Sequence, residues 1–176
     1  AEARGLHNLK STADALPHYT DEANVELFTR HGVYSRVEME SREEALLEEY
    51  YKTLHIEALT MSDMVREEIL PACVAYQSDL AKTVKNKKEA GVAGGMEADL
   101  LGRVSALTEE LYTKGRALDT AVAQAPAADA ETVANYYHDT ILPAMDAVRA
   151  PADQLEMLVG KKYWPFPTYS DILFYV

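Results

Sequence analysis

Apolar residues recur every three or four positions along most of the chain, which is the spacing of one face of an α-helix. The clearest stripe extends from Leu47 to Val84 without a glycine, and Ser35-x-x-Glu38 ahead of it matches a capping box. The residues of this stripe share one helical face: Leu47, Tyr51, Leu54, Ala58, Met61, Val65, Ile69, Ala72, Tyr76, Leu80 and Val84. The pattern predicts one long helix or two helices in tandem.

Further stripes predict more helices. One extends from Met96 to a turn at residues 125–128, another starts at a cap on Asp129, and residues 21–31 form a short helix ended by a glycine. The lysines at 85, 87 and 88 suit the carboxyl-terminal end of a helix, and the glycine-rich residues 91–95 that follow predict a flexible turn. Because no run of alternating β-branched residues occurs, the sequence predicts an all-α fold, an antiparallel bundle of four or more helices with two long ones.

Prolines interrupt the helical stripes. Pro71 and Pro143 lie inside long stripes, where proline lacks a backbone donor and crowds the carbonyl group four residues earlier, so we expect kinks there, the first of them a kink or break close to Leu70. The tetrapeptide Ile-Leu-Pro-Ala occurs at both places, which is compatible with matched kinks but too short to indicate a repeat. Pro151 is expected in the first turn of a short last helix ending at Val159.

The net charge, hydropathy and cysteine content exclude several classes of partner and site. Acidic residues outnumber basic ones by 29 to 17, giving a net charge of −12, which argues against nucleic acid and anionic membranes as partners. No window reaches the roughly 18 apolar residues of a membrane span, so we expect a cytoplasmic protein. Cys73 has no disulfide partner and is expected to be a buried apolar residue. Because the chain starts at Ala1 without methionine, we expect it to be cut from a longer protein.

Candidate chemistry is sparse. None of the five histidines has an acidic residue three positions before it, so the Glu-x-x-His pairs of di-metal bundles are absent. His55 and His138 are expected to be hydrogen-bonded structural residues, because Glu57 and Asp139 are one or two positions away and point elsewhere on a helix. We expect the glutamates at positions 38–49 to lie on a solvent-exposed helix face. The sequence therefore predicts no catalytic, cofactor-binding or metal-binding residue in this chain.

The most unusual segment is the tail, residues 161–176. It holds six of the fifteen aromatic residues, and two alternating prolines at 165 and 167 prevent a continuous helix. The candidate interface residues are Tyr163, Trp164, Phe166, Tyr169 and Phe174. Packing on this chain's own bundle and docking on another domain or subunit remain equal alternatives. We expect three regions: an N-terminal extension at 1–19, a helical bundle at 20–160 and the tail.

Two segments carry a resemblance to a known family. The tail from Tyr163-Trp164-Pro165-Phe166-Pro167 to Phe174, and the helical stretch from Tyr51 to Pro71 with His55-Ile56-Glu57-Ala58-Leu59, resemble the carboxyl-terminal region of type III glutamine synthetases. These are the large bacterial form of glutamate–ammonia ligase. The resemblance extends over most of the chain from about Leu16 and is least distinctive from Lys85 to Ala130. It implies a noncatalytic helical domain that serves subunit packing or supports a catalytic domain.

The resemblance also implies the properties of a parent enzyme of nitrogen metabolism. That enzyme would use ATP with Mg²⁺ or Mn²⁺ to form glutamine through a γ-glutamyl phosphate, in stacked hexameric rings. The family's catalytic signatures do not occur in these residues, so no catalytic residue is carried over and no cofactor is expected in this fragment; its partners would be the parent's catalytic domain and neighbouring subunits. The alternative is a free-standing helical-bundle adaptor, and an autonomous metal enzyme ranks third.

Overall fold

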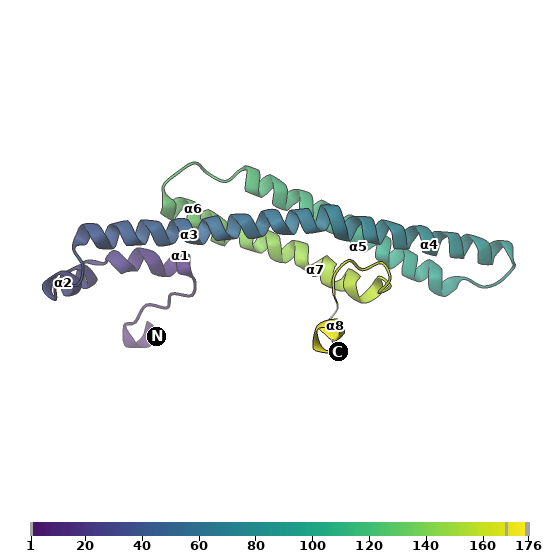
Figure 1. Cartoon of the computed structure of the whole chain (residues 1–176), viewed down its shortest axis with the longest axis horizontal. Helices are drawn as coiled ribbons and strands as arrows, with labels where there is room; N and C mark the ends of the chain where they lie inside the picture. Colours follow the sequence, from purple (N-terminus) through teal and green to yellow (C-terminus); the bar gives the residue numbers. More distant parts are fainter. Residues whose placement is uncertain (1, 168, 175–176) are drawn as a thin grey trace. The chain divides into compact units, whose positions relative to one another are not determined.

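The computed structural model describes residues 2–167 and 169–174, and all regular structure among them is helical (Figure 1). The elements follow in the order η1 (Glu2–Arg4), α1 (Thr12–Ala15), η2 (Leu16–Thr20), α2 (Glu22–Arg30), α3 (Arg36–Asp63), η3 (Met64–Ile69), α4 (Leu70–Glu89), α5 (Gly95–Ala123), α6 (Ala130–Tyr136), η4 (Tyr137–Ile141), α7 (Leu142–Leu158) and α8 (Tyr169–Leu173). The predicted all-α fold is confirmed. None of the described helices combines the length and apolarity needed to cross a bilayer.

The chain forms two compact units, each built from two separate segments. The first comprises Ala1–Ala58 and Ala121–Pro143, and the second Leu59–Thr120 and Ala144–Val176. The division into an extension, a bundle and a tail that we expected from the sequence remains a prediction.

Several helix ends follow the local signals in the sequence. The Ser35 backbone N–H donates to Glu38 Oε2 at 2.8 Å and the Glu38 N–H donates to Ser35 Oγ at 3.3 Å, which completes the predicted capping box of α3. Asp129 Oδ1 accepts from the Thr132 N–H at 2.9 Å and caps α6. Gly32 follows α2 with φ +65°, a left-handed conformation that glycine adopts without steric cost. These boundaries were set by residues within one turn.

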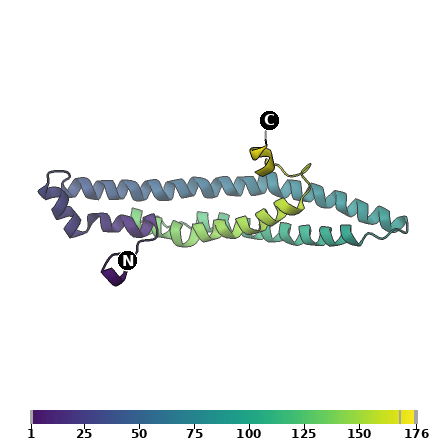
Figure 2. The ribbon, with the colours of Figure 1, turned by 90° about the horizontal axis from the view of Figure 1, so that it is seen from below.

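The first unit packs the amino-terminal part of α3 against helices on both sides of it in sequence. Figures 1 and 2 show α1 running alongside α3, and α1 also contacts α6. Thr20 at the end of η2 donates through Oγ1 to Glu43 Oε2 of α3 at 2.5 Å. Fully buried apolar side chains form the core of this unit: Met39, Ala58, Ala134 and Ile141.

The second unit contains an antiparallel pair, α4 and α5, joined by residues 90–94, which overlap the turn predicted at 91–95 (Figure 2). Gln77 bridges the pair, because its Nε2 donates to Thr108 Oγ1 at 2.9 Å and its Oε1 accepts from Ser105 Oγ at 3.0 Å. Lys87 and Glu97 form an ion pair close to the turn. The core of this unit includes Cys73, Val104, Leu111, Leu118, Val148 and Leu155, each at most 1% exposed.

In both Ile-Leu-Pro-Ala sequences the isoleucine is the last residue of a π-helical turn. The Leu70 N–H bonds to the carbonyl of Val65 and the Leu142 N–H to that of Tyr137, five residues back in each case. Since the next residue is a proline that can neither donate nor approach the carbonyl group four positions earlier, the wider turn accommodates its ring. The helix continues through Pro71, so the irregularity predicted near Leu70 is a π turn and not a break.

The prediction for Pro151 was wrong. This residue lies inside α7 and does not begin a separate last helix. Its ring is among the most deeply buried side chains, and Val148 and Leu155 on the same face are 1% and 0% exposed. Burial of this continuous apolar face outweighs the loss of one backbone hydrogen bond, which the sequence pattern could not weigh.

Candidate functional site

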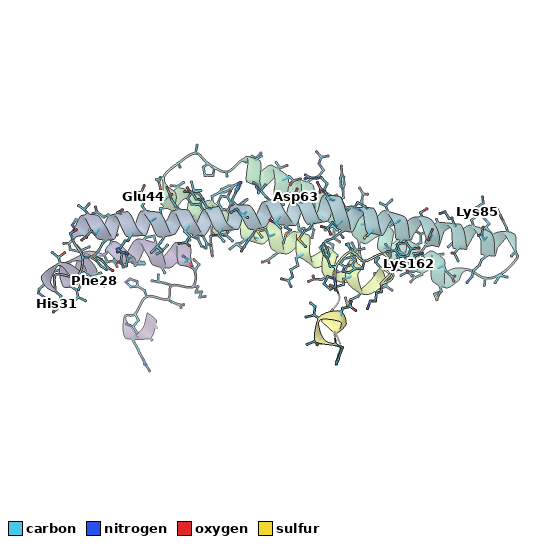
Figure 3. All side chains as sticks on the ribbon, in the orientation of Figure 1. Phe28, His31, Glu44, Asp63, Lys85 and Lys162 are labelled. Atoms are coloured by element: carbon cyan, nitrogen blue, oxygen red, sulfur yellow. The ribbon has the colours of Figure 1, made fainter. Side chains whose placement is uncertain are left out.

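The first part of the tail, together with Gly160 ahead of it, is bonded to α4. The Tyr163 N–H donates to the Gly160 carbonyl at 2.8 Å, and the Tyr163 hydroxyl donates to the carboxylate of Asp79. The Tyr163 ring lies 5.2 Å from the ring of Tyr76, centroid to centroid. The hydrogen bond raises the pKa of Tyr163 and lowers the pKa of Asp79, because it favours the hydroxyl as donor and the carboxylate as acceptor. We call residues 160–166 the stem; Lys162 marks its position in Figure 3.

The stem continues with two aromatic side chains in contact. Trp164 and Phe166 are half-buried, and their rings meet edge to face with centroids 6.3 Å apart. The backbone is non-helical at 164–167, as the alternating prolines predicted.

Beyond the prolines the chain turns into α8, a short helix that the sequence analysis did not predict. An ion pair joins Lys161 of the stem to Asp171 of α8. Ile172, Leu173 and Phe174 are 67%, 62% and 76% exposed, and we call these three residues the apolar end. Three adjoining large apolar side chains in solvent are typical of an interaction surface.

The five predicted interface residues therefore have different surroundings. Tyr163 binds this chain's own α4, Trp164 and Phe166 contact each other, and Phe174 lies in solvent. The side chain of Tyr169 is outside the described part of the structure. Sequence reasoning missed Tyr76 and Asp79 as partners of the tail, because Asp79 and Tyr163 are 84 positions apart and no local pattern connects them.

His55 has the structural role that the sequence predicted. Its Nδ1 lies 2.8 Å from the hydroxyl of Tyr137, whose ring is almost fully buried, and burial raises the pKa of that hydroxyl. The pair borders an open hollow of about 670 Å³ in the first unit. The walls of this hollow come from α3 and from the segment that leads into α6: Tyr51, Lys52, Ile56, Ala125, Pro126, Ala127, Ala128 and Val133.

Cys73 and His138 are a buried and a hydrogen-bonded residue, as predicted, but the reason given for His138 was wrong. Cys73 is 0% exposed and burial raises the pKa of its thiol, which confirms the prediction of a buried apolar residue. The argument that His138 and Asp139 point apart was wrong, since Nδ1 lies 2.7 Å from Oδ1 of Asp139. Both residues belong to the π turn η4, whose geometry differs from the regular helix that the argument assumed.

Among the described residues, one group of three side chains could hold a metal ion: His7, His18 and Asp21 of the first unit. Their potential ligand atoms all lie within 4.8 Å of one another. The Glu-x-x-His pattern of di-metal bundles places the acid three residues before the histidine, whereas Asp21 follows His18 by three. That reversed spacing could have indicated the pair, but no sequence signal joins His7 to it.

The profile of the glutamine synthetase C-terminal domain family matches residues 1–88 of the chain. The chain is 40% identical over 179 residues to a glutamine synthetase of Butyrivibrio fibrisolvens and 34% identical over 181 residues to a type-3 glutamine synthetase of Dictyostelium discoideum. A glutamine synthetase of Bacteroides fragilis (strain YCH46) is 28% identical over 184 residues. Each alignment covers 99% of this chain and 25% of the relative. The chain thus spans about a quarter of the length of these curated relatives.

Proposed function

This chain belongs to the glutamine synthetase C-terminal domain family, and on that premise we propose that it is a noncatalytic helical domain of a type III enzyme that serves subunit packing or supports the catalytic domain. The observation that carries the packing role is the apolar end, three exposed apolar side chains held next to a stem that is bonded to α4. A fastened stem limits the positions that the apolar end can take, so less conformational entropy is lost when a partner covers it.

The parent enzyme would join ammonia to glutamate in the cytoplasm, with ATP and Mg²⁺ or Mn²⁺ bound by its catalytic part. Such ions take oxygen ligands, chiefly carboxylates and phosphates. The candidate metal-binding cluster among the described residues contains two imidazoles and one carboxylate, which does not fit that group. We therefore derive no step of the ligase reaction through residues of this chain.

The partner of the apolar end would be the catalytic domain or a neighbouring subunit of a homo-oligomer built of stacked hexameric rings. Interface centres are enriched in aromatic side chains and depleted of charge, which the sequence Ile172-Leu173-Phe174 satisfies. The relatives are about four times as long as this chain, and we place the surface that would cover the apolar end in the remaining part of such a parent protein.

The test uses the full-length parent with serine at all three positions of the apolar end. We expect the assembly to dissociate into smaller species in native mass spectrometry, because the apolar area that drives association is lost. The matched control replaces exposed apolar residues elsewhere, Val37, Met96 and Met157, which are 72%, 72% and 79% exposed. An intact assembly in the apolar-end variant, or equal dissociation of the control, would contradict the packing role.

A second measurement tests the noncatalytic role. The 176-residue chain, incubated with glutamate, ammonia and ATP, should form no glutamine. Turnover by the isolated chain would overturn the assignment. A reading frame that encodes no catalytic domain upstream would favour the free-standing adaptor instead.

A further inference from the structure

An exposed corner of the first unit brings two histidines and a carboxylate together. The rings of His7 and His18 are stacked with centroids 4.3 Å apart and planes inclined by 28°. His18 Nδ1 lies 3.0 Å from Oδ2 of Asp21. The two imidazoles and the carboxylate therefore lie close enough for their nitrogen and oxygen atoms to contact one ion.

Asp21 has an unusual role for its position. It is the N-cap residue of α2, where an aspartate carboxylate ordinarily accepts a hydrogen bond from a backbone N–H of the first turn. Its side chain makes no such bond and faces His18 instead. The usual capping interaction has been replaced by a contact with an imidazole.

The backbone around the pair is fixed by neighbouring side chains. Asn24 Nδ2 donates to the carbonyl of His18 at 2.8 Å, and the backbone N–H groups of Asn24 and Val25 both bond to the carbonyl of Asp21. Thr20, between the two ligands, is bonded to Glu43 of α3. Two of the three ligands are therefore held on a rigid turn, as metal ligands need to be.

We propose that His7, His18 and Asp21 form a binding site for Zn²⁺, with water as the fourth ligand. Two imidazole nitrogens and one carboxylate oxygen are a ligand set that zinc accepts in open tetrahedral sites. Ligand atoms about 2.1 Å from the ion at tetrahedral angles stand about 3.4 Å apart. The pair of His18 and Asp21 is already close to that separation at 3.0 Å, and no separation in the group exceeds 4.8 Å.

The ion would replace the proton between His18 and Asp21 and bind both groups directly. Ligation of His7 would then fasten the segment at residues 5–10 to η2 and to the start of α2. This departs from the sequence-based prediction that the chain has no metal ligand. The inference concerns only the first unit and is independent of the proposed packing role.

The experiment titrates Zn²⁺ into the tag-free 176-residue chain by calorimetry. We expect one equivalent to bind, and His7→Ala, His18→Ala and Asp21→Asn each to weaken binding by about tenfold or more, as loss of a metal-binding interaction does. The matched control is His138→Ala, which removes a histidine that also contacts an aspartate, at 2.7 Å, but has no third ligand nearby among the described residues. Mg²⁺ in place of Zn²⁺ should give no binding at this site.

Trypsin provides a readout that a purely structural role of the three residues would not change. The bond after Lys10 lies between the ligands His7 and His18, so Zn²⁺ should slow its cleavage, and EDTA should restore the rate. Cleavage after Lys88, an exposed residue near the end of α4, should be unaffected. Absence of stoichiometric binding, equal loss in His138→Ala, or cleavage after Lys10 that ignores Zn²⁺ would each overturn the proposal.

Discussion

Substitutions at Gly102 and Gly115 of α5 test how closely this helix approaches the π turn η3. A methyl group added at Gly115 would lie 3.4 Å from Cγ1 of Val65, whereas one added at Gly102 would meet no atom within 4 Å. Gly115 is buried and Gly102 is exposed. Substitution of both glycines by alanine and by phenylalanine therefore separates intrinsic helix propensity from packing against Val65.

The expected free energies follow from this difference. Alanine in place of glycine inside a helix stabilises by about 1 kcal/mol, and we expect Gly102→Ala to gain this amount and Gly115→Ala to gain no more. Phenylalanine at 115 has no room, because the adjoining hollow of about 80 Å³ is roughly half the ~150 Å³ cavity that holds a benzene ring. Overpacking of this kind costs about 1–3 kcal/mol, whereas Gly102→Phe should be neutral or slightly stabilising.

The assay is urea unfolding followed by far-UV circular dichroism, supported by the melting temperature. For a chain of 176 residues, each kcal/mol shifts Tm by about 2–4 °C, so Gly115→Phe should melt about 2–12 °C below the unsubstituted chain. Gly102→Phe is the control for the helix propensity of phenylalanine and for the effect of its ring on solubility. Equal unfolding free energies for the two phenylalanine variants would refute the close approach of α5 to Val65.

Three further predictions follow from buried or paired groups. Tyr137→Phe leaves Nδ1 of His55 without its partner and should lower the free energy of unfolding by about 1 kcal/mol in urea; an unchanged value would show that the bond contributes nothing. The hydrogen bond from Lys87 lowers the pKa of the Glu97 carboxyl below its ordinary 4.5. The stabilisation from this pair is therefore present above pH 4.5 and is lost as the pH falls through the folded-state pKa. Glu97→Gln should make the free energy of unfolding fall less steeply at acid pH, and an equally steep fall would contradict this. The Cys73 thiol should react with a thiol reagent only after urea unfolding, and rapid labelling of the folded chain would show that the site opens.

The sequence was a good guide to the helices because helical structure is local. The capping box at Ser35 and Glu38, the cap at Asp129 and the left-handed Gly32 all act within one turn, so neighbouring residues suffice to place the ends. Pro151 shows the limit of this reasoning. Its place inside α7 depends on what its buried face contacts, which the local pattern does not contain.

The candidate sites were predictable only in part. Composition indicated that the tail carries an unusual density of aromatic rings, but which of them bind this chain and which lie in solvent was not readable from it. Tyr163 bonds to Asp79, and the ring of His7 stacks on that of His18. Neither pair has the three- or four-residue spacing of neighbours on one helix, so the sequence pattern does not connect them.

By itself the sequence determined the all-α class, the positions of the long helices and the family resemblance, because each rests on periodicity or on contiguous motifs. The tertiary structure decided that a π turn precedes each Leu-Pro-Ala sequence and that the helix then continues through the proline. It also decided that the stem binds α4 while the apolar end faces solvent, and that the Asp21 side chain contacts His18 and does not cap α2. Each of these is a competition between a local preference and a contact made by distant residues, and only folding brings those residues within reach.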